Sequence, residues 1–258
     1  MTFSAEWLRL REPVDHRSRN AVVMRALEDH FVDAGSVTVV DLGSGIGSNL
    51  RGTSPLLPPN QKWILIDHDP ILLRQTGATE GIHAELLTSD LAISLEAVIE
   101  EFKPDLITAA AFIDLASEAW IERLAEAARR QRCAVYLPLN YDGVEHWQPA
   151  HDSDWQILSA FTRHQLRDKG LGSALGPRAA SKAVAVLQSR QFTVVAGESY
   201  WRLDDGDQCL KQLLAAGIAD AVKQTQLVPE HVVTCWGLDR QMGGSCTIGH
   251  VDIFAAPP

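Results

Sequence analysis

The chain has 258 residues, 46% of them apolar, a composition typical of a soluble globular protein with a large core. Its formal net charge of -10 argues against DNA, RNA and anionic membranes as partners, because those partners attract basic surfaces. The opening residues MTFSAEWLRLREP lack the apolar stretch of a signal peptide, and no apolar window is long enough to span a bilayer, so we expect a cytoplasmic protein.

Residues 5 to 34 are predicted to be helical. Apolar side chains recur there three and four residues apart, and Gly35 stands where a helix would end. Residues 1 to 35 would then form a helical cap on the domain. Four arginines precede the regular part of this pattern, namely Arg9, Arg11, Arg17 and Arg19.

Residues 37 to 52, VTVVDLGSGIGSNLRG, are the most informative stretch of the chain. They predict a buried strand that ends at Asp41, a tight glycine loop and the first turn of a helix, an arrangement that lets a nucleotide-type ligand lie against bare backbone. A dinucleotide fingerprint, G-x-G-x-x-G, would require glycine at position 48, where Ser48 stands. The pattern is instead an acid followed by Gly43, Gly45 and Gly47.

This pattern resembles the cofactor motif of class I S-adenosylmethionine (SAM) dependent methyltransferases. The resemblance implies that Asp41 and the three glycines hold the cationic methionine end of SAM, with residues 36 to 139 as the cofactor-binding half. It also implies a Rossmann-like α/β fold, with a seven-stranded, mostly parallel sheet, an antiparallel last strand and helices on both faces. Because an N-terminal segment folds over the cofactor in many methyltransferases, one of the four arginines could pair with the SAM carboxylate, or simply face solvent.

The second and third strands supply further cofactor candidates. A second strand is predicted from Trp63 to Asp67, and the resemblance makes Asp67 the ribose ligand, with His68 exposed beside it. A third strand is predicted from Ile82 to Leu87. By resemblance the adenine lies between Asp90 and Leu91, although an aspartate there could equally be the N-cap of the next helix.

The fourth predicted strand, DLITAAAF, ends where the methyl group would lie in this fold. Ala110 is expected at the cofactor and Phe112 at the substrate. Asp114 follows, either as a group that orients or deprotonates the substrate or as a cap of the helix from Ser117 to Arg130. A fifth strand is predicted from Cys133 to Leu139.

Residues 140 to 176 are predicted to form a lid or substrate insertion. NYDGVEHWQPAHDSD reads as a long polar and aromatic loop, and a helix from about Trp155 to Arg167 follows it. Tyr141, His164 and Lys169 are the substrate candidates in this segment. His164 falls on an apolar helix face, where a histidine is either catalytic or a satisfied structural residue.

The remaining residues, 177 to 258, are predicted to complete the sheet. A helix begins at Pro177, a sixth strand spans Phe192 to Ala196, and two helices lead to a last strand from Cys246 to Ala256. The resemblance places this last strand antiparallel between the fifth and sixth. His250 and Asp252 share one of its faces, as a pocket pair or as a buried pair that satisfy each other.

Three further segments extend the resemblance to an uncharacterised bacterial subgroup of SAM methyltransferases, and they are FTRHQLRDKGLGSALGP, YWRL and GHVDIFA. The four cysteines lie far apart without a C-x-x-C pair, so we expect reduced thiols, and we predict no metal site.

The sequence therefore predicts methyl transfer from SAM to an oxygen, nitrogen or carbon atom of a small molecule. If the acceptor must lose a proton, the candidates are His164, Asp114 and His250, in that order. Two alternatives stay open, an NAD(P)-dependent oxidoreductase and a non-catalytic SAM-binding regulatory or scaffold protein. We expect one domain, a small-molecule partner, no nucleic acid and no membrane, with a homodimer as the assembly to test.

Overall fold

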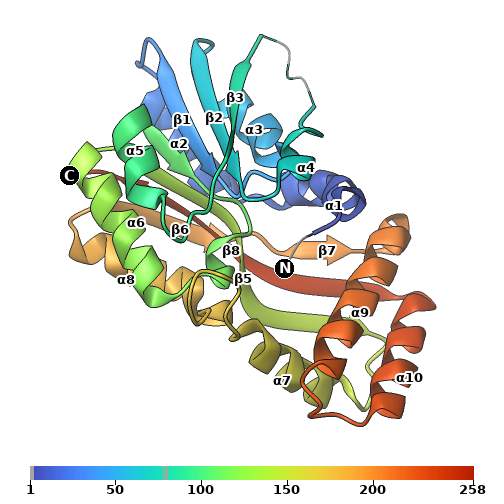
Figure 1. The fold of residues 1–258 in the computed structure, drawn as a ribbon. Coiled ribbons are helices and arrows are strands. Elements are labelled where there is room, and N and C mark those ends of the chain that lie inside the picture. The colour runs from blue at the N-terminus through green and yellow to red at the C-terminus, as the bar shows by residue number, and fades with distance from the viewer. Residues whose placement is uncertain (1–2, 78, 80) are drawn as a thin grey trace.

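The computed structural model describes residues 3–77, 79 and 81–258, and its centre is one mixed β-sheet (Figure 1). The strands are β1 (Val37–Leu42), β2 (Gln61–Asp67), β3 (His83–Thr88), β4 (Leu106–Thr108), β5 (Ala134–Gln148), β6 (Thr193–Glu198), β7 (Trp201–Leu203) and β8 (Ser245–Ala256). Seven of them lie in the order β3-β2-β1-β4-β5-β8-β6, and β7 pairs with β8 beyond that row. The first five are parallel, whereas β8 runs antiparallel to β5, β6 and β7. The predicted mostly parallel sheet and the antiparallel last strand between the fifth and sixth strands are confirmed, and the short β7 is an addition.

Helices cover both faces of this sheet. They are α1 (Ala5–Ser18), α2 (Ala21–Phe31), α3 (Ser48–Thr53), α4 (Pro70–Leu73), α5 (Leu95–Phe102), α6 (Glu118–Gln131), α7 (Asp154–Gln165), α8 (Ala179–Ser189), α9 (Gln208–Lys223) and α10 (Glu230–Gln241). Four short 3-10 turns, among them Ile113–Leu115 after β4, complete the described elements.

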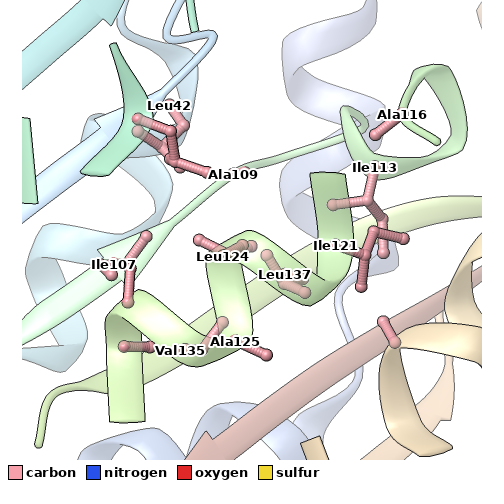
Figure 2. Packing of buried hydrophobic residues seen from close by; sticks show 14 of the residues in the cluster. Leu42, Ile107, Ala109, Ile113, Ala116, Ile121, Leu124, Ala125, Val135 and Leu137 are labelled. Carbon is pink, nitrogen blue, oxygen red and sulfur yellow. The ribbon is translucent and has the colours of Figure 1, made fainter. Parts of the chain in front are cut away.

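The strands are apolar on both sides because both faces are buried. Val40 and Leu42 of β1 pack toward α5, α6 and α8, whereas Val37 and Val39 belong to the opposite cluster with α2. Figure 2 shows the first of these layers, where strand residues such as Ile107 and Val135 meet Leu124 of α6. Alternate side chains along a strand therefore belong to two separate cores, one on each face of the sheet.

The N-terminal cap consists of two helices rather than the single helix predicted for residues 5 to 34. Asn20 interrupts the helical pattern because its side chain accepts hydrogen bonds from the amides of Val22 and Val23 and so caps α2. Its own backbone amide donates to Asp252 of β8 at 2.8 Å. Because the chain changes direction at Asn20, α2 packs against the sheet and α1 does not continue along the same axis.

The prediction of a long loop from residue 140 is wrong. β5 continues as a strand to Gln148 and pairs with β8 as an antiparallel arm. The register shifts between Tyr141 and Glu145, where three residues of β5 stand opposite Gly249. This bulge contains Asp142 and Gly143, a pair that is typical of turns, which explains why the sequence pattern resembled a loop.

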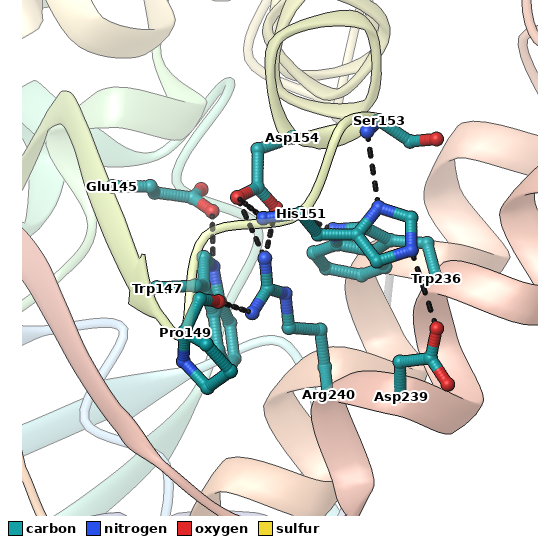
Figure 3. Close-up of polar contacts among 9 residues, drawn as sticks. All are labelled: Glu145, Trp147, Pro149, His151, Ser153, Asp154, Trp236, Asp239 and Arg240. Atoms are coloured by element: carbon teal, nitrogen blue, oxygen red, sulfur yellow. Dashed lines mark hydrogen bonds and ion pairs between the residues drawn. The ribbon is translucent and has the colours of Figure 1, made fainter.

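A third core surrounds the arm. α7, α9 and α10 gather around the far ends of β5 and β8 (Figure 1), with buried residues such as Trp147, Ile218 and Trp236 between them. Figure 3 shows one polar anchor of this region, in which Arg240 of α10 donates to both the carboxylate of Asp154 and the carbonyl oxygen of Pro149. Within the segment predicted as a lid or substrate insertion, the end of β5 therefore extends the sheet, and α7 packs against this extension.

Candidate functional site

The glycine loop lies between β1 and α3, at the carboxyl end of the parallel strands. Gly43, Gly45 and Gly47 have φ values of 69°, 54° and 79°, a left-handed conformation that favours glycine. Asp67, at the end of β2, holds the loop in place, because its Oδ2 accepts a hydrogen bond of 2.9 Å from the Gly45 amide. The motif residues that were predicted to hold a cofactor are therefore brought together.

Asp41 is completely buried below this loop. Its Oδ1 accepts a 2.8 Å hydrogen bond from Asn49, which also donates to Thr108 of β4. Burial raises the pKa of Asp41 to about 7, although the hydrogen bond from Asn49 acts in the opposite direction. Its second oxygen, Oδ2, has no hydrogen-bond partner among the described residues, and neither has the hydroxyl of Ser44 in the loop.

Helix α1 covers the loop. The side chain of Leu8 lies against Gly45, Glu12 binds Arg51 with two contacts of 2.6 Å, and a ring nitrogen of His16 lies 3.0 Å from the carbonyl oxygen of Ser48. The N-terminal segment thus folds over the loop, as the resemblance implied.

The four N-terminal arginines are all engaged within the protein. Arg9 contacts Gln75, Arg11 pairs with Asp15, and Arg17 pairs with Asp207. Arg19 is buried and donates to Asn49 and Thr53. Since Asn49 also binds Asp41, Arg19 is the arginine that joins the hydrogen-bond network beneath the loop.

The other predicted cofactor residues occupy different environments. Asp67 is buried and also accepts from the Asp69 amide, whereas His68 is exposed, with its Nδ1 3.2 Å from Asp67 Oδ1. Asp90 is exposed and accepts from the Ala92 amide, and α5 begins only at Leu95. The Leu91 side chain is part of the core on the α5 and α6 face.

The segment after β4 contacts the glycine loop through Phe112, and its Ala111 lines a cavity. Ala110, Ala111 and Phe112 are half-buried, and Ala111 has a left-handed φ of 48°. The Phe112 ring lies so close to Gly43 that a β-carbon on that glycine would overlap it. A side chain other than hydrogen at position 43 would therefore displace Phe112.

The cavity, of about 640 Å³, brings together all three predicted proton acceptors and two of the predicted substrate residues, with His164 in both groups. Asp114, His164, His250 and Tyr141 line it, from four different elements. Lys169 is not among the lining residues, and its Nζ lies 3.4 Å from His164 Nδ1.

Asp114 has the properties expected of a proton acceptor. It lies in the 3-10 turn after β4, is 9% exposed, and its Oδ1 has no hydrogen-bond partner within the described part of the chain. Burial raises the pKa of Asp114 to about 6, so the carboxylate is largely ionised at neutral pH. The alternative role as a helix cap belongs to Ser117, whose hydroxyl accepts from the Trp120 amide.

The two histidines differ from Asp114. A ring nitrogen of His164 lies 3.2 Å from Gln224 Oε1, and burial together with the charge of Lys169 lowers the pKa of His164. Burial lowers the pKa of His250 to about 3, with a further contribution from Arg11, so its ring is neutral. Asp252 accepts from the backbone amides of Asn20 and Leu139, which gives it a structural role separate from His250.

Several lining residues were not predicted from the sequence. Trp7 and Arg11 come from α1, Trp201 comes from β7, and Glu145 comes from the extended part of β5. Burial raises the pKa of Glu145 to about 7, while hydrogen bonds from Tyr141 and Trp147 oppose this change. Of these four, Trp201 lay in the marked segment YWRL and Glu145 in the segment predicted as a loop, while Arg11 was identified only as a possible partner of the SAM carboxylate.

The described residues contain neither a candidate metal site nor a candidate membrane span. In residues 3–77, 79 and 81–258, no group of three or more His, Cys, Asp or Glu side chains is placed to hold a metal ion. Within the same residues, no helix has the length and apolar character needed to cross a membrane.

Sequence comparisons identified no matching family model and no matching curated protein. Solved structures do match. A candidate methyltransferase from Bacillus halodurans C-125 aligns over 92% of this chain and 100% of its own, with a TM-score of 0.52 and 12% identity. A candidate type II methyltransferase from Anaeromyxobacter dehalogenans aligns over 93% and 97%, with a TM-score of 0.51 and 12% identity.

A cyclopropane-fatty-acyl-phospholipid synthase-like protein from Lactobacillus casei ATCC 334 aligns over 95% of this chain and 98% of its own, with a TM-score of 0.50 and 12% identity. At such low identity these likenesses concern the fold. The chain therefore has the Rossmann-like fold of class I methyltransferases.

Proposed function

We propose that this protein is a SAM-dependent methyltransferase that acts on a small molecule. The observation that carries the proposal is the pair of buried polar atoms at the glycine loop, Asp41 Oδ2 and Ser44 Oγ, which have no partner among the described residues. Buried polar groups are nearly always hydrogen-bonded, so these two fit a ligand with a cationic and hydrogen-bonding end. The methionine part of SAM has that chemistry.

The remaining parts of the cofactor would follow the strand ends. Asp41, Gly43, Gly45 and Gly47 would hold the methionine end, and Asp67 would hold the ribose. An ionised carboxylate can accept about four hydrogen bonds, so Asp67 keeps acceptor capacity beyond its two backbone contacts. The adenine would lie near His68, Asp90 and Leu91, with Ala110 toward the methyl group.

The bound cofactor would supply an electrophilic methyl group on its sulfonium. The protein then has to align the acceptor with that group and exclude water, and such positioning can contribute about 7 to 11 kcal/mol. The half-buried segment from Ala110 to Phe112 lies between the glycine loop and the cavity, which makes it the place where donor and acceptor would meet. Asp114 is the first candidate for the acceptor's proton, ahead of His164 and His250, because it combines an ionised carboxylate with an unpartnered oxygen.

A thermal-shift titration tests this proposal. SAM or its demethylated product S-adenosylhomocysteine at 100 times its dissociation constant should add about 2.7 kcal/mol to the free energy of unfolding. For a chain of this size, that addition should raise the melting temperature by roughly 5 to 10 °C. We expect Asp67→Ala to lose this shift, since it removes the ribose ligand and the anchor of Gly45.

Asp69→Ala is the matched control. Asp69 caps the short helix α4, so its loss should lower the melting temperature of the free protein but leave the shift with SAM intact. A shift with NADH and none with SAM or S-adenosylhomocysteine would contradict the proposal.

A further inference from the structure

Three residues that line the cavity each carry a buried polar atom with no hydrogen-bond partner in the described part of the chain. The atoms are Trp7 Nε1, Asp114 Oδ1 and His250 Nδ1. The side chains of Asp114 and His250 belong to residues that are only 9% and 5% exposed. Because native proteins rarely leave such atoms unsatisfied, their convergence on one cavity indicates a ligand that both donates and accepts hydrogen bonds.

The hydrogen-bonding groups around the cavity separate the possible ligand classes. A carboxylate ligand can only accept hydrogen bonds, and it would meet the carboxylates of Asp114 and Asp220 in the lining. The Arg11 guanidinium, which also lines the cavity, already binds Asp15 through contacts of 2.8 and 3.1 Å. An ammonium ligand can only donate, so it would leave the Trp7 indole N–H without an acceptor. A hydroxyl group both donates and accepts, so it could serve both Asp114 and Trp7.

The walls of the cavity are aromatic and aliphatic. Trp7 and Trp201 lie on one side with ring centroids 6.4 Å apart, and Tyr141 and Phe161 form an edge-to-face pair with centroids 6.0 Å apart. Leu213, Leu214 and Ile218 of α9 complete the lining. Such walls suit a planar ring, because aromatic groups gain from offset or edge contacts with one another.

Glu145 stiffens one wall. Its carboxyl accepts from Tyr141 OH at 2.8 Å and from Trp147 Nε1 at 3.5 Å. Figure 3 shows the second of these contacts. These contacts fix the Tyr141 hydroxyl, so Tyr141 presents its ring to the cavity while its polar end is satisfied. Among the described lining residues, the buried side-chain atoms without a partner belong to Asp114, His250 and Trp7.

We propose that the methyl acceptor is an uncharged aromatic alcohol of the phenol type, bound in this cavity with its hydroxyl donated to Asp114. This inference rests on the proposed function. An alkyl amine of similar shape would be an ammonium at neutral pH and could not accept from Trp7, whereas a carboxylic acid would be a carboxylate and could not donate to Asp114.

The proposed reaction transfers one methyl group to the phenol oxygen and one proton to Asp114. The phenol oxygen forms a bond to the methyl carbon while the carbon–sulfur bond breaks, and the electron pair of that bond stays on sulfur. The hydroxyl proton passes to the Asp114 carboxylate, and the products are an aryl methyl ether and S-adenosylhomocysteine. Trp7 Nε1 is the donor available to the acceptor oxygen.

Three probes with one ring system test the ligand class without any cofactor. They are 2-naphthol, 2-naphthoate and 2-naphthylmethylammonium, titrated into the full chain by calorimetry near neutral pH. We expect 2-naphthol to bind at least tenfold more tightly than either charged probe. Tighter binding of a charged probe would overturn the proposal.

Matched variants locate the probe. Asp114→Asn keeps the size of the side chain but removes the charged acceptor, and should weaken 2-naphthol binding about tenfold. Trp7→Phe keeps a ring but removes the donor and should weaken binding severalfold. Asp33→Asn, at an exposed site after α2, is the control and should leave binding unchanged.

Unchanged 2-naphthol affinity in both cavity variants, with melting curves that show them folded, would overturn the assignment. The two proposals fail separately. Binding of 2-naphthol without a thermal shift by SAM would contradict the methyltransferase function alone, whereas a SAM shift without 2-naphthol binding would contradict the acceptor class alone.

Discussion

At the scale of single residues, Asp41 has the most unusual environment in the cofactor region. Burial raises its pKa from 3.8 to about 7, so between these pH values the folded protein holds a proton that the unfolded chain has released. Protons bound by the folded state alone make stability fall as pH rises. Asp41 therefore lowers stability progressively from about pH 4 to pH 7 and by a constant amount above that range.

Asp41→Asn should remove this pH dependence, since an amide stays neutral and keeps an oxygen for the hydrogen bond from Asn49. We expect the melting temperature of the variant to decline less than that of the wild type between pH 5 and pH 8. Thermal unfolding in a series of buffers measures it, with Asp33→Asn as the control that should follow the wild type. Parallel curves for Asp41→Asn and wild type would show that the carboxyl does not titrate in this range.

At the scale of elements, the β5 and β8 arm supplies several walls of the cavity that Asp114 lines. It carries Tyr141, Glu145 and His250, which line the cavity, and it supports α7, α9 and α10. The sequence did not reveal this arm because the bulge at residues 142 to 144 breaks the alternation of apolar and polar side chains. Asp-Gly at that point is a turn signal that the pairing with β8 overrides.

The tip of the arm provides a test of this packing. A β-carbon on Gly244 would overlap the carbonyl oxygen of Gln148, whereas one on Gly243 would meet no atom within 4 Å, and both glycines have positive φ. We expect Gly244→Ala to lower the free energy of unfolding by about 2 kcal/mol more than Gly243→Ala, because only the former forces backbone apart. That difference corresponds to roughly 4 to 8 °C in melting temperature. Equal melting temperatures for the two variants would contradict the described pairing at the tip.

At the scale of the whole molecule, much of the fold could be predicted from local patterns. Buried strands are short apolar runs, and Asp41 and the glycines that follow it have a spacing that one family of proteins shares. The parallel strands, the place of the antiparallel last strand and the glycine loop could therefore be predicted. The cavity could be predicted only in part. Asp114, Tyr141, His164 and His250 were identified as polar or aromatic residues near strand ends or on an apolar helix face.

The remaining residues of the cavity depend on contacts between distant segments. Trp201 Nε1 donates to Asp15, 186 residues earlier in the chain, and this bond joins β7 to α1 beside Arg11. A periodic pattern of apolar residues cannot predict a pairing between segments so far apart in the sequence. Whether Leu91 faces a ligand or the core is likewise decided by tertiary packing, here by α5 and α6.

Hydrogen exchange tests most directly whether SAM binds at the glycine loop beneath α1. Backbone amide exchange is measured with and without S-adenosylhomocysteine at saturating concentration. We predict slower exchange in residues 41 to 49, in residues 67 to 69 and in α1, because the ligand would lie between these segments. Unchanged exchange in all three segments, or protection confined to other parts of the chain, would contradict this prediction.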